Sequence, residues 1–275
     1  TSEFSYVIAG KRSKIVAPME SFDTAIQNVI DTLLTSHVIQ SKNEITGVGH
    51  RISHGGRYYS APVLVDEDVK SKIDELAVLS PLHNPVNLLG IEAFEKLLPH
   101  AQEVAVFDTS FHHTIPAKAY MYALPYSYFE DHGIRRYGFH GPSHEYIAQR
   151  APELFGKEKT HRMISCHLGN GGSLTALLDG KSVNSSMGFT PLAGIVMGTR
   201  SGDIDPEIIP FIEEEFHMTS QEVRNMLNKD SGLLGISGLS NDIRDLDKAA
   251  QAGNKRAQLA LDVYVHQIQQ YIGAY

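Results

Sequence analysis

The chain of 275 residues carries a net charge of −8 and is 42% hydrophobic, with a pI near 5.9. Its length and apolar content suffice for one large globular domain or two of ordinary size. The acidic balance argues against a nucleic-acid-binding surface, which usually carries a basic excess. The single cysteine, Cys166, excludes an intrachain disulfide framework and fits a reducing compartment, and no apolar run reaches membrane-spanning length. We therefore expect a cytoplasmic protein with neither a nucleic-acid nor a membrane partner.

The first part of the chain predicts mixed strands and helices. Short β-rich runs at residues 5–9 and 13–17 flank Gly10 and predict a hairpin. Ser21 suits a helix N-cap, because apolar residues recur after it at helical spacing. A strand, two helices and a buried strand follow at residues 45–52, 66–79, 85–98 and 104–107. This order resembles a ribonuclease H-like half without its first strand, so we expect an α/β fold.

The second part of the chain repeats the mixture. Its predicted strands lie at residues 163–168, 173–178 and 181–187. Its predicted helices lie at residues 142–154, 206–215, 220–227 and 242–251, and from Lys255 onward. We expect two domains, residues 1–109 and 110–275, with a ligand-binding cleft between them.

A glycine-rich turn joins the first two strands of the second part. Gly169, Asn170, Gly171 and Gly172 tolerate positive φ angles, which predicts a tight hairpin, and Asp-Gly at residues 179–180 predicts a second turn. Such a hairpin exposes backbone N–H groups without side chains in the way, which suits an anion such as phosphate. A turn with only a structural role is the alternative.

Two charged residues follow predicted strands of the first part. Arg51 stands beside glycines and can present its planar fork to a carboxylate or phosphate, with a surface ion pair as the alternative. His50 and His54 have a metal-binding spacing only on a helix, and the glycines argue against one. Asp108 directly follows a buried strand, where α/β enzymes place catalytic groups, although capping a turn explains it equally.

Two further residues occupy loops of the second part. His140 stands between Phe139 and Gly141 just before a predicted helix, where it can donate to an anion, and burial in the core is the alternative. Arg200 lies in a Gly/Ser-rich loop, which favours anion contact over a solvated helix face. Loop arginines, a strand-end aspartate, histidines and a phosphate-type hairpin together are typical of phosphoryl transfer.

Long motifs in the chain resemble those of the acetokinase family, in order and at the family's spacing. They are HRISHGG, SPLHNP, VFDTSFH, YGFHGPSH, SCHLGNGGS, MGFTPLAGIVMGTRSGDIDP and SGLLGISGLSNDIRDL. The resemblance covers nearly all of the chain from Gly49 onward. It implies two ribonuclease H-like domains of the actin-like ATPase kind around a cleft. The acid would bind on the side of residues 1–109 and the nucleotide on the side of residues 110–275.

The resemblance also implies a reaction and its participants. The family interconverts ATP and acetate with ADP and acetyl phosphate by direct in-line transfer, uses Mg²⁺ or Mn²⁺, and forms homodimers. Asp108 would act as acid or base or position the carboxylate, Arg51 and Arg200 would hold the acetate and the phosphoryl group, and His140 would stabilise the transition state.

Binding residues follow from the same resemblance. The acetate pocket, including Arg51, would be walled by Ser53, Leu82, Phe139 and Pro191. Ser53 is smaller and more polar than the apolar residue expected there. The nucleotide phosphates would be lined by His167, Leu168, Gly169, Asn170 and Gly171. The rest of the nucleotide would be reached by Asp242, Ile243 and Arg244.

The chain also departs from the family pattern. It lacks the opening Asn-Ala-Gly-Ser-Ser-Ser-x-Lys phosphate loop, the Gly-Ile-Gly-Glu-Asn adenosine loop and a late metal-binding glutamate. We therefore expect segments, including the Mg²⁺ ligands, to be missing at both ends, assign no metal ligand here, and leave the activity of this chain open. The alternatives are a propionate or butyrate kinase, a non-catalytic actin-like nucleotide-binding fragment, and a metallohydrolase. The 14 histidines favour the last, although no HExxH motif occurs.

Overall fold

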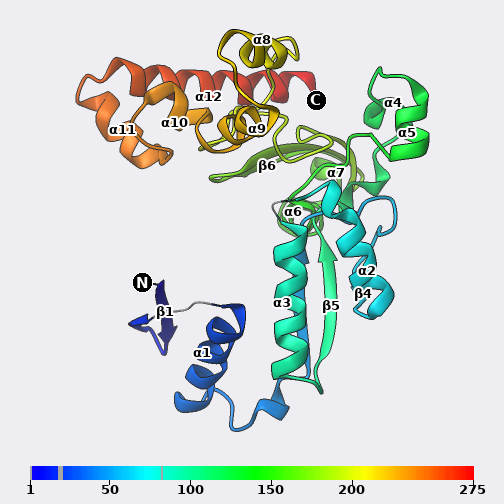
Figure 1. Ribbon diagram of the computed structural model, residues 1–275, viewed down its shortest axis with the longest axis vertical. Coiled ribbons are helices and arrows are strands. Elements are labelled where there is room, and N and C mark those ends of the chain that lie inside the picture. The colour runs from blue at the N-terminus through cyan, green and yellow to red at the C-terminus, as the bar shows by residue number, and fades with distance from the viewer. Residues whose placement is uncertain (1, 18–20, 82) are drawn as a thin grey trace. The chain divides into compact units, whose positions relative to one another are not determined.

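The computed structural model describes residues 2–17, 21–81 and 83–275 (Figure 1). The chain divides into two compact units, residues 1–107 and residues 108–275. Within the described ranges, none of the helices combines the length and apolar character needed to cross a lipid bilayer.

The first unit contains five strands and three α-helices in its described part. The strands are β1 Ser2–Ile8, β2 Lys11–Ala17, β3 Gly47–Ile52, β4 Val63–Leu64 and β5 Gln102–Phe107. The α-helices are α1 Phe22–Thr35, α2 Glu67–Glu75 and α3 Asn84–Leu97. Short 3₁₀ turns occur at Lys42–Glu44 and Leu76–Val78.

A three-stranded sheet positions Arg51, a predicted site residue of the first unit. β5 lies in its centre, parallel to β3 and antiparallel to β4, and the β3–β5 register sets Arg51 beside Val106 and Ile52 beside Phe107. α3 runs along these strands (Figure 1), and the side chains of Ile73 and Ile91 are buried against Ile52 and Phe107. Since parallel strands end at one edge, Arg51 and the residues after Phe107 leave the sheet on the same side.

The predicted N-terminal elements of the first unit are confirmed. β1 and β2 form an antiparallel hairpin that turns at Ala9 and Gly10, both with positive φ. The Ser21 side chain accepts a hydrogen bond from the N–H of Thr24 and caps α1. α1 then packs on α3 through Ile26 and Ile30 in a small apolar cluster. The strand β4 was not predicted, because two residues carry no measurable periodicity.

The second unit contains three strands and nine α-helices in its described part. The strands are β6 Arg162–Leu168, β7 Gly172–Leu178 and β8 Lys181–Ser185. The first four helices are α4 Ala117–Tyr120, α5 Tyr126–His132, α6 Gly141–Phe155 and α7 Lys157–Thr160. The remaining five are α8 Ile208–Glu215, α9 Ser220–Lys229, α10 Gly232–Ser237, α11 Ile243–Gln251 and α12 Lys255–Ala274. A 3₁₀ turn lies at Ser110–Thr114.

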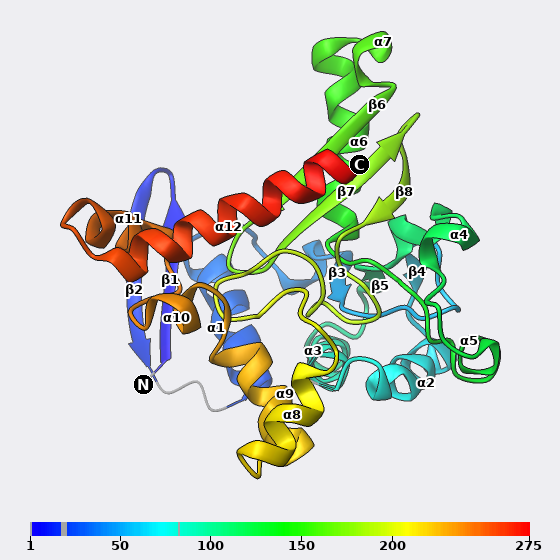
Figure 2. The same ribbon diagram turned by 90° about the horizontal axis from the view of Figure 1, so that it is seen from above.

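Helices cover both faces of the antiparallel sheet β6–β7–β8 (Figure 2). Ser165 and Ser173 face α6, because both hydroxyls contact His144 of that helix. Their neighbours Ile164 and Leu174 point to the other face and pack in the apolar cluster of α10, α11 and α12. The two-residue alternation of the strands therefore separates a polar interface with α6 from an apolar core.

Both predicted hairpins form, but for different physical reasons. Asp179 and Gly180 have φ of 50° and 76°, as the turn prediction required. The glycine turn before β7 is not in the left-handed region, so the expectation of positive φ there is wrong. Gly172 is closely packed, since a Cβ there would lie 2.9 Å from Cδ1 of Ile195.

Two buried histidines hold α6 and the turn at Ser110–Thr114 against the sheet. Nε2 of His112 lies 2.9 Å from the carbonyl oxygen of Phe139, and Nδ1 lies 2.9 Å from the Ser182 hydroxyl. A carbonyl only accepts, so Nε2 carries the proton. Burial lowers the pKa of His112 to about 4. It also lowers the pKa of His144 to about 2, with smaller contributions from neighbouring imidazoles.

We predict that the free energy of unfolding falls as the pH drops below 6.5. The folded chain keeps His112 and His144 neutral, while in the unfolded chain both take up protons around their ordinary pKa of 6.5. Each ring then removes about 1.4 kcal/mol of stability per pH unit until its folded pKa is reached. Urea unfolding between pH 7 and pH 5 measures the slope.

The control variants isolate one ring. His112→Gln should flatten the slope between pH 6 and pH 5 by about 1.4 kcal/mol per unit. His266→Gln, on an exposed position of α12, should leave it unchanged. An equal slope in wild type and His112→Gln would contradict the assignment.

Candidate active site

A single close contact fixes the start of α6 on Asp108. The carbonyl oxygen of this buried residue accepts the N–H of Gly141 at 2.8 Å. A Cβ on Gly141 would lie 2.4 Å from that oxygen, so only glycine fits. His140 precedes it as the N-cap, with φ 58° and ψ 27°, a backbone region that costs a non-glycine residue about 1–2 kcal/mol. Such strain at a candidate site is a reason to expect a functional role for the His140 ring.

The glycine hairpin brings His140 and Arg200 to one point. A Cβ on Gly171 would lie 3.5 Å from Nε2 of His140 and 3.5 Å from Nη1 of Arg200. The His140 ring stacks on His167, with centroids 4.0 Å apart and planes 21° from parallel. Nδ1 of His167 lies 2.9 Å from the hydroxyl of Ser143. One guanidinium and two imidazoles thus gather where no side chain blocks an anion.

The loop that carries Arg200 is held by its backbone. The N–H groups at the start of α10 donate to the carbonyl oxygens of Met197 and Gly198, at 2.9 and 3.0 Å. Gly198 itself donates to the carbonyl of Asn170 at 2.9 Å, which ties the loop to the hairpin. Nη1 of Arg200 donates to the carbonyl of Pro191 at 3.3 Å. Arg200 and Pro191, both predicted site residues, therefore lie in contact.

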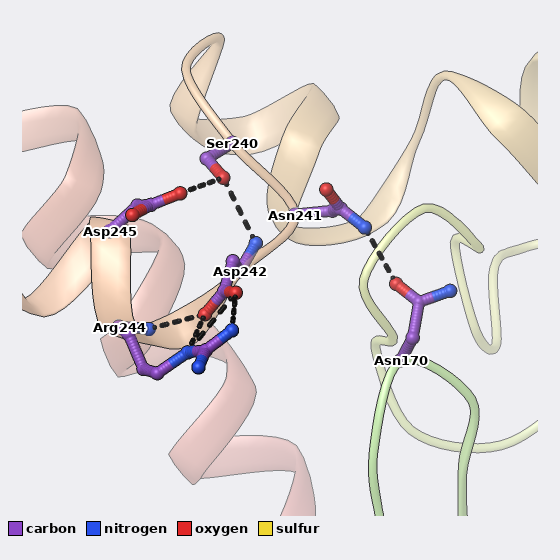
Figure 3. Close-up of polar contacts among 6 residues, drawn as sticks. All are labelled: Asn170, Ser240, Asn241, Asp242, Arg244 and Asp245. Atoms are coloured by element: carbon purple, nitrogen blue, oxygen red, sulfur yellow. Dashed lines mark hydrogen bonds and ion pairs between the residues drawn. The ribbon is translucent and has the colours of Figure 1, made fainter. Parts of the chain in front are cut away.

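A cavity opens on the other side of the hairpin. It measures about 330 Å³ and is lined by Gly169, Asn170, Leu233, Asn241, Asp242 and Ile243. Two of these lining residues contact each other, since Nδ2 of Asn241 donates to Oδ1 of Asn170 at 2.8 Å (Figure 3). Four residues predicted to bind the nucleotide thus line one cavity. Gly169 and Asn170 are expected at its phosphates, and Asp242 and Ile243 at the rest of the nucleotide.

Asp242 and Arg244 form a tight local unit at the start of α11 (Figure 3). The Asp242 carboxylate accepts the Arg244 N–H at 2.8 Å and its Nη2 at 2.5 Å. These bonds lower the pKa of Asp242 to about 2, so the carboxylate is charged at neutral pH. A carboxylate repels phosphate but accepts hydrogen bonds from hydroxyl groups, which suits the ribose end of a nucleotide.

The predicted residues of the first unit lie at the end of β3. Arg51 is exposed there, and the turn after it is fixed by α3. The N–H of Ser53 donates to Asn87 at 3.0 Å, and that of His54 donates to the fully buried Asn84 at 3.1 Å. Leu82, the remaining predicted wall residue, lies outside the described residues.

The paired histidines of this segment have separate partners. Nε2 of His50 pairs with the buried carboxylate of Glu103, whose pKa burial raises and His50 lowers, with burial the larger effect. Nδ1 of His54 accepts the N–H of Gly56 at 2.9 Å. His50 lies in a strand rather than a helix, as the flanking glycines indicated.

Two predicted site residues, Phe139 and Leu168, differ in exposure from residues that line a pocket. The ring of Phe139 is 1% exposed and packs against Met187 and Met197, so it supports the site from within the core. Leu168 is 52% exposed at the end of β6.

Sequence reasoning missed the polar contacts behind His140. The hydroxyl of Ser173 lies 2.8 Å from Nδ1 of His140 and 2.8 Å from Nε2 of His144, whose Nδ1 lies 2.9 Å from the hydroxyl of Ser165. The signal was present in the spacing. His140 and His144 are four residues apart at a helix start, and Ser165 and His167 alternate along one strand face.

A metal site does not emerge from these residues. Within the ranges that the structure describes, no three His, Cys, Asp or Glu side chains gather in a way that could hold a metal ion. The donors near Gly171 are cationic or neutral nitrogens, which suit an anion rather than a cation.

Comparisons with known proteins agree on one family. The model of the acetokinase family matches residues 2–275. An acetate kinase of Geobacillus kaustophilus is 52% identical over 273 residues, which are 99% of this chain and 69% of that protein. An acetate kinase of Listeria monocytogenes serovar 1/2a is 51% identical over 275 residues, 100% of this chain and 69% of that protein.

Solved structures agree with the sequence comparisons. The crystal structure of Porphyromonas gingivalis acetate kinase matches 98% of this chain and 69% of its own, with a TM-score of 0.91 and 42% identity. A propionate kinase from Francisella tularensis matches 98% of this chain and 68% of its own, with a TM-score of 0.91 and 40% identity. The expected α/β fold of the actin-like ATPase kind is thereby confirmed, and the chain belongs to the acetokinase family of enzymes.

Proposed function

We propose that the chain serves the reversible transfer of a phosphoryl group between ATP and acetate, which gives ADP and acetyl phosphate. The observation that supports this most is the approach of His140 Nε2 and Arg200 Nη1 to the same glycine, Gly171. Such donors neutralise the charge that spreads over the transferring group. The relatives from Geobacillus kaustophilus and Listeria monocytogenes are acetate kinases.

The proposed step conserves atoms and charge in a simple way. A carboxylate oxygen of acetate attacks the γ-phosphorus of ATP in line with the leaving oxygen. The new bond between this carboxylate oxygen and the γ-phosphorus forms as the bond between the γ-phosphorus and the β–γ bridging oxygen breaks. No proton need move, so the protein's contribution is positioning and charge stabilisation.

The catalytic roles follow from side-chain chemistry. Arg51 holds the acetate carboxylate in a bidentate fork, and Arg200 neutralises the phosphoryl group in flight. His140 donates a hydrogen bond to a phosphoryl oxygen in the transition state. Asp108 orients the reacting groups, since the proposed transfer needs no proton donor.

The family resemblance assigns the contacts with the acid to Ser53, Leu82 and Pro191, and we propose that the buried Phe139 supports them from the core of the second unit. A short carboxylic acid has one charge and a small apolar tail, which a bidentate arginine and a tight wall recognise together.

The nucleotide lies along the glycine hairpin in this proposal. His167, Leu168 and the residues 169–171 line its phosphates, and the negative Asp242 accepts from the ribose hydroxyls. Ile243 is 41% exposed at the cavity rim and offers an apolar contact for the base. Arg244 holds the Asp242 carboxylate in place.

The family resemblance adds Mg²⁺ or Mn²⁺ to the reaction. Because the described residues form no cluster that could bind such an ion, no step above is assigned to it. We also retain the homodimer, the cytoplasmic location and the assignment of the acid to residues 1–109 and the nucleotide to residues 110–275 as parts of the proposal.

Propionate is the second candidate substrate. The likeness to a propionate kinase structure at 40% identity favours it. One methylene group changes affinity in such a pocket by only about 1–3 kcal/mol, so the pocket walls tune rather than dictate the acid.

We expect acyl phosphate formation, highest with acetate, when ATP and Mg²⁺ are supplied with acetate, propionate or butyrate. Hydroxylamine traps the product as a coloured hydroxamate. The assay uses both the 275-residue chain and the protein at its natural length. A higher rate with propionate would replace acetate as the substrate, and no product from either sample would refute phosphoryl transfer to these acids.

We predict that Arg51→Ala and Arg200→Ala each lower kcat by about 10²-fold, because each removes a charge that the transition state needs. Arg51→Lys and Arg200→Lys should recover part of the loss, since the charge stays but the fork is lost. Steady-state kinetics in the protein at its natural length measure the effect. Arg150→Ala, which breaks only an exposed ion pair with Glu153, is the control. Wild-type turnover in both alanine variants would contradict the proposed charge stabilisation by Arg51 and Arg200.

We predict that Ile243→Ser raises the KM for ATP about five- to tenfold and leaves the KM for acetate unchanged. The base would lose roughly 1 kcal/mol of apolar contact with this half-exposed side chain. Leu259→Ser, at an exposed position of α12, should change neither constant. An unchanged KM for ATP would place the base elsewhere.

A further inference from the structure

Three buried polar groups behind His140 form a continuous chain. Ser165, His144 and Ser173 are almost completely buried, and they connect in that order to Nδ1 of His140 by contacts of 2.8–2.9 Å. The proposed function uses only the last member, His140. The other three contact no expected substrate group, so their arrangement needs its own explanation.

If both imidazoles are neutral and the Ser173 proton is donated within the chain, the protons have two possible arrangements. In the first, Ser165 donates to Nδ1 of His144, Nε2–H of His144 donates to Ser173, and Ser173 donates to Nδ1 of His140. His140 then carries its own proton on Nε2. In the second, every donor and acceptor is reversed, and His140 carries its proton on Nδ1.

The surroundings of His140 select between these arrangements. Nε2 faces Gly171 together with the guanidinium of Arg200, and the ring lies flat on His167. A nearby guanidinium disfavours a second positive charge on His140. A neutral ring can then serve an anion at Gly171 only as the Nε2–H tautomer, since phosphoryl oxygens accept but do not donate.

We propose that His144 is a positioning residue which, through Ser173, holds His140 in the Nε2–H form and so presents a donor to the transferring group. Burial keeps His144 a neutral ring with one proton, so it donates from one nitrogen only. In the proposed arrangement Ser165 donates to the other nitrogen, and every proton of the chain is donated in the direction of His140.

The first test reads the tautomer of His140 directly. We would label the histidines of the 275-residue chain with ¹⁵N, assign His140 by the signals that His140→Gln removes, and record long-range ¹⁵N–¹H correlations. Wild type should show the Nε2–H form alone. Ser173→Ala and His144→Phe should give a mixture of tautomers, while His144→Gln, whose amide N–H can replace Nε2–H, should keep the wild-type form.

A matched control separates positioning from loss of a buried hydroxyl. Ser182→Ala removes another fully buried serine hydroxyl, which contacts His112 instead, and should leave the His140 tautomer unchanged. An Nδ1–H form or a mixture in wild type would overturn the inference. So would an unchanged tautomer in Ser173→Ala.

The second test is kinetic and rests on the proposed function. In the protein at its natural length, Ser173→Ala should lower kcat about tenfold and leave both KM values within twofold, because only the transition-state donor is misoriented. In a His140→Ala background the same substitution should change kcat less than twofold. If the losses in kcat of the two single variants simply added in the double variant, the proposed positioning of His140 through Ser173 would be wrong.

The two tests fail separately. A protein without phosphotransfer activity would refute the proposed function, yet the tautomer of His140 in the free chain would still be measured. A wrong tautomer in an active enzyme would refute the inference and leave the proposed function standing.

Discussion

The contact between Gly141 and Asp108 is the constraint on which the second unit's candidate site depends. Because a Cβ at Gly141 would lie 2.4 Å from the Asp108 carbonyl oxygen, the start of α6 can approach this closely only with glycine there. The approach sets His140 in the left-handed region as N-cap. One turn further, His144 reaches the hydroxyls of β6 and β7. The backbone hydrogen bond thereby connects Asp108 to the start of α6, and His144 connects α6 to the sheet of the second unit.

The loop that carries Arg200 is held by Asp203 and by the helix α12. The carboxylate of Asp203 accepts the N–H of Gly194 at 2.8 Å and the hydroxyl of Tyr271 from α12. Burial and this bond raise the pKa of Tyr271, so the phenol keeps its proton and remains a donor. Gln267 of the same helix accepts the N–H of Val196 at 2.6 Å. The long helix α12 therefore fixes the loop geometry without contributing a predicted site residue.

Local patterns sufficed to predict the strands other than β4, the long helices and the hairpins, because those elements have clear periodicity and turn residues. Short helices such as α4 and α10 escaped, since four to six residues give no periodic signal. The candidate site residues Arg200, His140 and Asp108 could be proposed from their loops and strand ends. The residues that hold the site could not be proposed, because Ser173 behind His140 and Asn84 behind the turn after β3 have local sequence surroundings without a distinctive pattern and act through tertiary contacts. The hairpin shows the same limit, since Gly172 packs closely on Ile195 and has no positive φ.

The histidines of the second unit make sense once their charge is considered. The rings of His140 and His167 lie 4.0 Å apart, and two positive charges at that distance would repel by about 4 kcal/mol at an effective dielectric constant of 20. His112 and His144 are kept neutral by burial. The neutral imidazoles of His112 and His144 therefore supply directed hydrogen bonds, while the fixed positive charge near Gly171 comes from Arg200. Because one arginine supplies the charge and the imidazoles supply hydrogen bonds, such a site can bind an anion without placing several positive charges beside a buried core.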